Sequence, residues 1–245
     1  MTIALVTFDF WQTLLAETPA SGAAARALRL SGVREALGRA GRRYDAAALA
    51  AADARALAAL DGIWRARRDV GPAEQVRVFL EALDPALPGV LSPEERAAVE
   101  TAYAVPVLAH PPAVAPGAVA AIRWLGTRGL TLGVISNTGR TPGSILRRLL
   151  DRAGVLDAFR VFSFSDEIGV RKPDPEIFRR TLAAAGCDPE AAVHVGDDPV
   201  NDVAGARALG MRALHYVPDG GPASATADGV LRHFAEVPAL LTRLP

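Results

Sequence analysis

Short apolar runs that alternate with helical patterns constrain the fold of this chain more than any other feature. In the second half of the sequence these runs are rich in valine, leucine, isoleucine and phenylalanine, and a segment with helical periodicity separates each from the next. Such runs are typical of strands buried on both faces, and the helices between them form parallel crossovers. The alternation predicts a parallel sheet with strands at residues 130–135, 159–164, 192–195 and 212–216. Helices are expected at residues 118–128, 141–153, 175–185 and 200–209.

A further strand-like run, residues 3–8, lies near the N-terminus and ends at Asp9. Between it and the alternating half, the chain is rich in alanine, leucine and arginine and has almost no strand pattern. Helices are expected there over residues 26–37, 46–68, 72–83 and 93–108. The sequence therefore predicts an α/β protein. Its core, a Rossmann-like doubly wound parallel sheet, comprises residues 1–16 and 110–245, and an all-helical cap domain is inserted at residues 17–109.

Charge and cysteine content narrow the expected partners. The chain has 27 basic and 27 acidic residues, so it has no basic excess for binding nucleic-acid phosphates. Cys187 is the only cysteine, and the first residues lack the basic and apolar segments of a secretory signal. No apolar run reaches the roughly 18 residues that cross a bilayer. We expect a cytoplasmic monomer or homodimer that binds neither nucleic acid nor membrane.

Polar residues follow the predicted strands at the edge where open parallel sheets bind ligands. One of them, Lys172, is the only lysine among the 27 basic residues. A compact ammonium group fits a cramped site in which a planar guanidinium would clash. His194, in contrast, lies inside a strand-like run and is expected to be a core residue with satisfied hydrogen bonds. The candidate site residues at the strand ends are Asp9, Ser136, Asn137, Lys172, Asp197 and Asp198.

These residues fall within four short motifs, which occur in a fixed order. The motifs read FDFWQTL (8–14), GVISN (133–137), KPDP (172–175) and VGDD (195–198), and Asp202 follows the last of them. In order and composition they resemble the motifs of the haloacid dehalogenase superfamily. The resemblance covers residues 1–16 and 110–245, and the helical insert lies where that family has its C1-type cap.

The resemblance implies a hydrolase that acts on a small phosphorylated metabolite. Asp9 would attack phosphorus and form an aspartyl phosphate, which divides one difficult displacement into two easier ones. Ser136 and Lys172, with the Asn137 amide, would stabilise the charge on the transferring phosphoryl group. The residues expected to contact the substrate are Trp11, Thr13, Asn137 and Arg140.

The resemblance also implies a magnesium ion. Its protein ligands would be the carboxylates of Asp9 and Asp197 and the main-chain carbonyl of Trp11, since Mg²⁺ prefers oxygen ligands and keeps several waters. Asp198 and Asp202 would lie behind these ligands. There Asp202 would orient Lys172 or a metal-bound water.

Trp11 departs from the family pattern. Phosphatases of the family usually have a second aspartate at this position, which protonates the leaving group, and tryptophan cannot transfer that proton. Loss of a positioned general acid typically costs about 100- to 10,000-fold in rate. The site would then suit acyl or aryl phosphates, or Asp198, Glu167 or a cap residue supplies the proton. Trp11 itself either contacts the substrate or only packs beneath the cap.

Two other functions stay open. Dehalogenases of the superfamily also lack the second aspartate and usually have an aromatic residue there. Displacement of halide from carbon needs no divalent ion, however, so the acidic pair after Gly196 favours the phosphohydrolase. A catalytically idle binding protein is the other alternative, and retention of Asp9, Lys172 and Asp197 argues against it.

Overall fold

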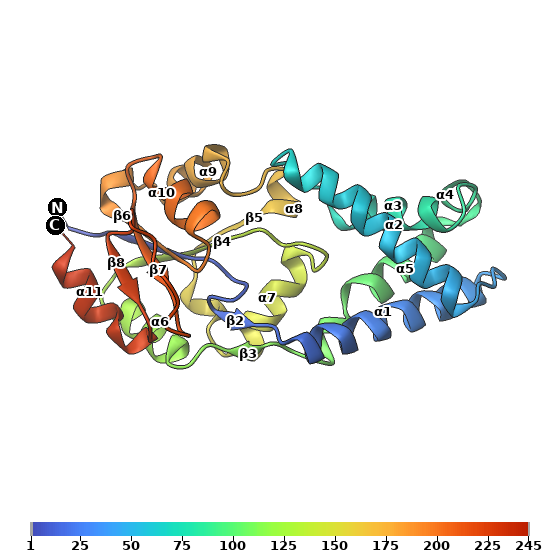
Figure 1. Cartoon of the computed structure of the whole chain (residues 1–245), viewed down its shortest axis with the longest axis horizontal. Coiled ribbons are helices and arrows are strands. Elements are labelled where there is room, and N and C mark those ends of the chain that lie inside the picture. Colours follow the sequence, from blue (N-terminus) through green and yellow to red (C-terminus); the bar gives the residue numbers. More distant parts are fainter. Residues whose placement is uncertain (1, 245) are drawn as a thin grey trace.

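The computed structural model describes residues 2–244, which form an α/β core and a bundle of helices at opposite ends of the long axis (Figure 1). The core sheet has six strands in the order β5-β4-β1-β6-β7-β8, and every neighbouring pair is parallel. This confirms the predicted parallel sheet and places β1 near its centre. The strands are β1 Leu5–Phe8, β4 Thr131–Ser136, β5 Val161–Phe164, β6 Ala192–Gly196, β7 Arg212–Tyr216 and β8 Gly229–Leu231.

Helices cover both faces of this sheet, which explains why its strands are apolar throughout. On one face, α6 (Ala118–Thr127), α7 (Gly143–Arg152) and α11 (Val237–Arg243) pack on a cluster that includes Val6 and Phe8. The opposite face carries α9 (Pro175–Ala185) and α10 (Gly205–Arg207), which pack on a cluster that includes Leu5 and Ile135. Successive residues of β1 thus enter different cores, as the period of two in a strand requires.

The bundle has a hydrophobic cluster of its own, to which Val33, Leu37, Leu49, Phe79 and Tyr103 contribute. Ser92 and Glu95 form the capping box of its last long helix, so the predicted start of this helix at residue 93 is confirmed. The helices of the bundle are α1 Pro19–Arg39, α2 Ala46–Arg65, α3 Pro72–Leu83, α4 Leu87–Val90 and α5 Pro93–Ala104.

Several boundaries differ from the sequence prediction, and local chemistry explains them. α1 begins at Pro19 because Thr18 and Ser21 cap it. α2 stops at Arg65, since Arg67 takes a left-handed φ of 58°. α5 ends at Ala104, and a 3₁₀ turn follows at Pro106, a residue that lacks the backbone donor for a further helical bond.

Other elements were missed by the prediction altogether. In place of one helix at 200–209, a π-helical segment (η4, Pro199–Ala204) leads into α10. The structure also contains short elements for which the sequence gives little periodicity. These are β2 (Leu15–Ala16), β3 (Ala113–Val114), α8 (Ser165–Ile168), α4, β8 and α11.

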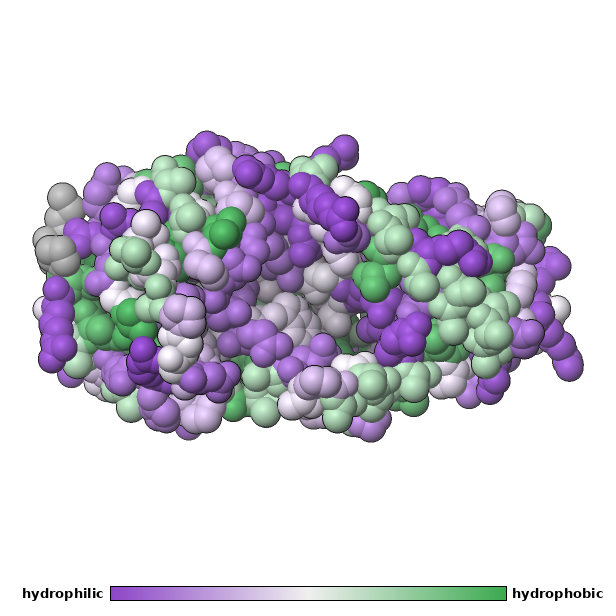
Figure 2. Space-filling view, in the orientation of Figure 1, coloured by the Kyte–Doolittle hydropathy of each residue, from purple (hydrophilic) through white to green (hydrophobic). Residues whose placement is uncertain are grey.

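The chain passes between core and bundle at one place. β2 and β3 pair as a two-stranded antiparallel sheet, with Leu15 opposite Val114, so the outgoing and returning segments lie side by side. The surface is hollowed between the two parts (Figure 2). None of the helices within residues 2–244 is long and apolar enough to cross a membrane.

A second, non-covalent attachment joins the two parts at the end of α2. Arg68 forms an antiparallel bridge with Val170, and the Asp69 N–H donates to the Gly169 carbonyl (3.0 Å). The buried Asp69 carboxylate accepts hydrogen bonds from Ser165 Oγ (2.5 Å), Arg171 (2.6 Å) and Trp64 Nε1 (2.9 Å). We call Asp69 with these three partners the clasp. It holds the bundle against the loop that leads to Lys172.

Candidate active site

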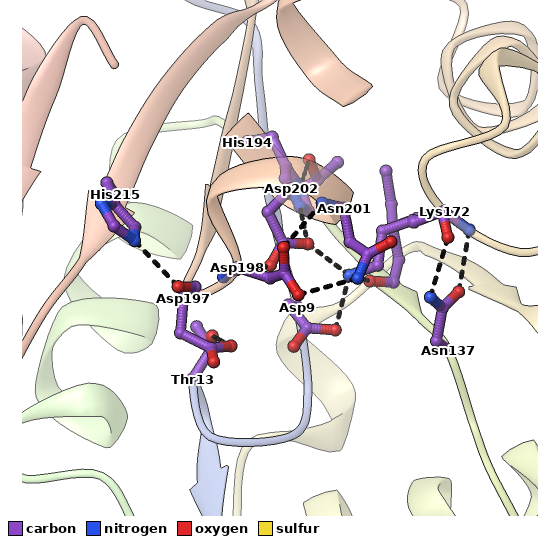
Figure 3. A network of polar contacts seen from close by, with 12 residues as sticks. Asp9, Thr13, Asn137, Lys172, His194, Asp197, Asp198, Asn201, Asp202 and His215 are labelled. Carbon is purple, nitrogen blue, oxygen red and sulfur yellow. Dashed lines mark hydrogen bonds and ion pairs between the residues drawn. The ribbon is translucent and has the colours of Figure 1, made fainter. Parts of the chain in front are cut away.

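The carboxyl ends of β1, β4 and β6 bring the predicted site residues together (Figure 3). Phe8 pairs with Val134 on one side and Val195 on the other, so Asp9 lies between the ends of the two flanking strands. The Asp9 N–H continues the ladder by donating to the Val195 carbonyl (2.8 Å). Asp9 is only 7% exposed.

Lys172 lies at the centre of the site with all three of its donors used. Its Nζ donates to Asp9 Oδ1 (2.6 Å), to the Ile135 carbonyl (2.9 Å) and to Asp202 Oδ1. Burial alone would lower the pKa of Lys172. The negative charges of Asp202 and Asp9 have the larger combined effect, so the pKa lies above its ordinary value. The ammonium group therefore stays charged and bridges two carboxylates. A guanidinium cannot converge on three acceptors around one atom.

Asn137 fixes the backbone at Lys172. Its Oδ1 accepts from the Lys172 N–H (2.8 Å), and its Nδ2 donates to the Lys172 carbonyl (3.0 Å). The predicted contact between Asn137 and the substrate stays a prediction, since the side-chain amide already has these two partners.

Asp202 and His194 extend the network into the core. Asp202 Oδ1 accepts from His194 Nε2 (3.0 Å), and Oδ2 accepts from the Asp198 N–H (3.0 Å). The other ring nitrogen of His194 is 2.8 Å from Thr7 Oγ1, so the prediction of a satisfied core histidine is confirmed. Burial raises the pKa of Asp202, but Lys172 and His194 outweigh it and hold that pKa below its ordinary value. Asp202 is therefore ionised and orients Lys172.

Asp9 and Asp197 are the carboxylates best suited to bind a cation. Oxygen atoms of Asp9, Asp197 and Asp202 lie within 4.8 Å of one another. Asp202 is already bound by Lys172 and His194. Burial raises the pKa of Asp9 to about 7 against the opposing charge of Lys172, and burial with the charge of Asp202 raises the pKa of Asp197. A divalent cation would relieve the repulsion that these pKa values report, so the residues fit Mg²⁺.

Two side chains hold Asp197 in place. Thr13 Oγ1 donates to Asp197 Oδ1 (3.0 Å), and His215 Nε2 lies 2.8 Å from the Asp197 main-chain carbonyl. Since the Ser224 N–H donates to His215 Nδ1 (2.9 Å), Nε2 is the protonated nitrogen of this ring and donates to Asp197. Thr13 thus positions a carboxylate, and its expected contact with the substrate stays a prediction. Sequence reasoning missed His215, because nothing in a strand pattern shows which neighbour a buried histidine meets.

Ser136 differs from its neighbours because it has no partner. The residue is fully buried, and its Oγ makes no hydrogen bond with any described residue. An unpaired buried hydroxyl is costly and is often found where a ligand completes the bonding. An unpaired hydroxyl at the end of β4, the strand that pairs with β1 before Asp9, fits the predicted contact with an anionic group.

Two pockets meet at Trp11. The smaller, of about 170 Å³, is lined by Asp9, Lys172 and Asp197, and the larger, of about 310 Å³, lies between core and bundle. Trp11 and Asn137 line both. Arg140, the predicted substrate contact, lines the larger pocket and forms a salt bridge with Asp53 of α2. The arrangement offers one compartment for a small reacting group and another for the rest of a molecule.

The residues proposed to replace the missing proton donor are used elsewhere. Glu167 forms a salt bridge with Arg147 and lines neither pocket. Asp198 accepts from the backbone N–H groups of Val200 and Asn201, both at 2.8 Å, and caps η4. Both oxygens of Asp198 thus have partners, since Asn201 Nδ2 donates to the second, but Asp198 lines the smaller pocket and its role as proton donor stays a prediction.

Comparison with known proteins assigns the family. A sequence model described as haloacid dehalogenase-like hydrolase matches residues 3–210. The chain therefore belongs to the haloacid dehalogenase-like hydrolases, which confirms the resemblance read from its four motifs.

Its relatives include both phosphatases and dehalogenases. A phosphoserine phosphatase of Thermus thermophilus is 38% identical over 144 residues, which are 59% of this chain and 54% of that protein. The chain thus spans about half the length of the curated relatives it matches. The structure of a 2-haloacid dehalogenase from Pseudomonas syringae pv. tomato matches with a TM-score of 0.73 and 28% identity, covering 100% of both chains. A phosphatase of the same family from Thermococcus onnurineus matches with a TM-score of 0.63 and 26% identity, covering 98% of both.

Proposed function

We propose that this chain is a magnesium-dependent phosphohydrolase that acts on a small phosphorylated metabolite through an aspartyl phosphate at Asp9. The observation that carries the proposal is the buried carboxylate of Asp9 and the half-buried carboxylate of Asp197, which lie close together beside the charged Lys172. Displacement of a halide requires only one carboxylate, the nucleophile. The second carboxylate here, Asp197, has a raised pKa and suits a metal ion. Phosphatases among the relatives support this choice.

In the proposed reaction, a carboxylate oxygen of Asp9 forms a bond to phosphorus as the bond to the leaving oxygen breaks. Lys172 and the free hydroxyl of Ser136 stabilise the charge that develops on the phosphoryl oxygens. Water then attacks the phosphorus of the aspartyl phosphate, which releases inorganic phosphate and restores Asp9. Bound Mg²⁺, held by Asp9, Asp197 and the Trp11 carbonyl, would neutralise phosphoryl charge.

Helices α1–α5, together with their connections (residues 17–109), form the cap in this proposal, because they supply one wall of the larger pocket. Trp11 replaces the usual proton donor, and the carboxylates of Asp198 and Glu167 already have hydrogen-bond partners. The leaving oxygen must then depart with little assistance. We therefore expect acyl and aryl phosphates to react faster than alkyl phosphates by about 100-fold or more.

The test is hydrolysis of p-nitrophenyl phosphate, acetyl phosphate and several sugar phosphates, each with magnesium and with EDTA. Magnesium-dependent phosphate release that disappears in Asp9→Asn supports the proposal. Full activity of Asp9→Asn would refute the nucleophile assignment. If no substrate reacts and magnesium does not bind, the idle binding protein becomes the better explanation.

A 2-haloacid dehalogenase is the second candidate. It is favoured by the aromatic Trp11 and by the full-length structural match to the Pseudomonas syringae enzyme. The same panel therefore includes 2-chloropropionate. Chloride release that is insensitive to EDTA would favour this function over the phosphohydrolase.

A further inference from the structure

The larger pocket contains a buried arginine without an acidic partner. Arg29, on α1, is only 5% exposed and lines this pocket. Its Nε donates to the main-chain carbonyl of Tyr103 (2.8 Å), and its guanidinium lies over the Tyr103 ring, 5.1 Å from the centroid. Within residues 2–244, its two terminal nitrogens have no hydrogen-bond acceptor and no carboxylate lies within salt-bridge distance. A buried cation without a counter-charge is costly, so a ligand is expected to supply one.

The other arginines nearby are already paired, in contrast. Arg26 and Arg140 both bind the single buried carboxylate of Asp53, one at each oxygen. Among the described residues that line the pocket, only Glu17 carries a negative charge, and it is exposed. Among these three arginines, Arg29 is therefore the one without a carboxylate partner within residues 2–244.

A second polar group nearby also has no partner. The Tyr103 hydroxyl is buried, and it makes no hydrogen bond with any described residue. Arg29 and Tyr103 are in contact, because the guanidinium lies over the tyrosine ring. The two unpaired groups therefore belong to neighbouring side chains. The bundle thus carries a guanidinium that lines the larger pocket without an acidic partner and, on the residue next to it, a buried hydroxyl without a partner among the described residues.

We propose that Arg29 binds a carboxylate of the substrate, at the end remote from the phosphoryl group. The two free nitrogens of a guanidinium match the two oxygens of a carboxylate in a bidentate pair. Trp11 and Asn137 line both pockets, so one small molecule can place its phosphoryl group at Asp9 and its carboxylate at Arg29. The inference rests on the proposed phosphohydrolase function and defines its substrates as small phosphorylated carboxylic acids.

The test compares two substrates that differ only in the carboxylate. Phosphoglycolate carries one, and ethyl phosphate has a methyl group instead. The wild-type protein should prefer phosphoglycolate in kcat/KM by about 10- to 100-fold, because hydrogen bonds to charged groups are among the stronger ones. Arg29→Met should abolish this preference, and Arg29→Lys should reduce it, since lysine keeps the charge but loses the bidentate geometry. Arg34→Met, at an exposed position of the same helix, should keep the preference.

The outcomes separate this inference from the proposed function. Hydrolysis of both esters with equal kcat/KM would overturn the role of Arg29 and leave the phosphohydrolase intact. No phosphate release from either ester, from p-nitrophenyl phosphate or from acetyl phosphate would refute the phosphohydrolase. A bisphosphate, ethylene glycol bisphosphate, tests the nature of the second anion. If it is preferred over phosphoglycolate, the carboxylate assignment is wrong. Circular dichroism shows whether Arg29→Met folds. If it does not, Arg29→Lys alone tests the inference, and an unchanged preference for phosphoglycolate in that variant overturns it.

Discussion

A Cβ atom at Gly196 would lie 2.2 Å from Cγ of Asp202. The absence of a side chain at Gly196 therefore creates the space that the Asp202 carboxylate occupies. From there Asp202 reaches Lys172 and His194. The glycine at this position is required by the close approach of a carboxylate.

Gly196→Ala is expected to displace Asp202 and with it Lys172. Overpacking of this kind typically costs about 1–3 kcal/mol of stability, and the displaced ammonium should lower kcat further. Thermal melting and hydrolysis of p-nitrophenyl phosphate measure the two effects. Gly38→Ala is the matched control, because a Cβ there meets nothing within 4 Å. Normal kcat in Gly196→Ala would show that Asp202 does not need this position.

Lys172→Arg should not restore activity, although it keeps the charge. Three acceptors converge on Nζ, and a planar guanidinium cannot meet them all in a side chain that is 2% exposed. We expect a loss of kcat of about 100-fold or more, comparable to removal of a preorganised donor. Steady-state kinetics with saturating magnesium would measure it. Wild-type turnover in this variant would refute the requirement for an ammonium group.

Magnesium should stabilise the folded protein in the absence of any substrate. A ligand that binds only the folded state at 100 times its Kd contributes about 2.7 kcal/mol, so the melting temperature should rise with magnesium concentration. Asp197→Asn should weaken this effect, since it removes one of two carboxylate ligands. Asp174→Asn, which alters only a helix cap, should retain it. A melting temperature that magnesium does not change would contradict the metal site.

His194 should make stability fall as the pH decreases. Burial holds the pKa of His194 below its ordinary value of 6.5. Below pH 6.5 the unfolded chain therefore takes up a proton that the folded protein does not, and stability is lost as the pH falls toward the folded pKa. The loss is at most about 1.4 kcal/mol per pH unit. Urea unfolding of His194→Gln between pH 7.5 and 5.5 should show a shallower dependence, whereas the exposed His110→Gln should match the wild type.

Asp69→Ala should loosen the clasp. The change leaves Arg171 without its carboxylate and Trp64 Nε1 and Ser165 Oγ without their acceptor. Breaking a buried ion pair in this way costs about 3–5 kcal/mol. Asp61→Ala, which removes an exposed pair with Arg65 on the same helix, should cost less than about 1 kcal/mol. Equal denaturation midpoints for the two variants would refute the structural role of the clasp.

The parts of the fold that could be read from the sequence are those with long, uninterrupted patterns. The central strands and helices such as α9 were predictable because burial on both faces, or on one helix face, determines which residues occur. β8 was not predicted, because it is a strand of only three residues, Gly229–Leu231, at the edge of the sheet. α11 was not predicted either, because it is short and partly exposed.

For the site, the sequence shows which residue types follow the strands but not which of them are already paired. Asp9, Lys172 and Asp197 were identified from motif order. Arg29 was not, because it is one of many arginines on alanine-rich helices and periodicity alone does not separate a solvated arginine from a buried one. Only the tertiary contacts show that no acidic side chain within residues 2–244 pairs with it.

The pairing of β2 with β3 has a consequence for how proteins of this architecture diverge. Since Leu15 and Val114 lie opposite each other, everything between them closes a loop whose ends the core already holds together. The entropy of closing such a loop grows only slowly with its length. An ancestral chain can therefore lengthen, shorten or exchange this segment without disturbing the register of the six-stranded sheet. The residues at the strand ends can then be retained while the inserted segment, and with it the choice of substrate, changes.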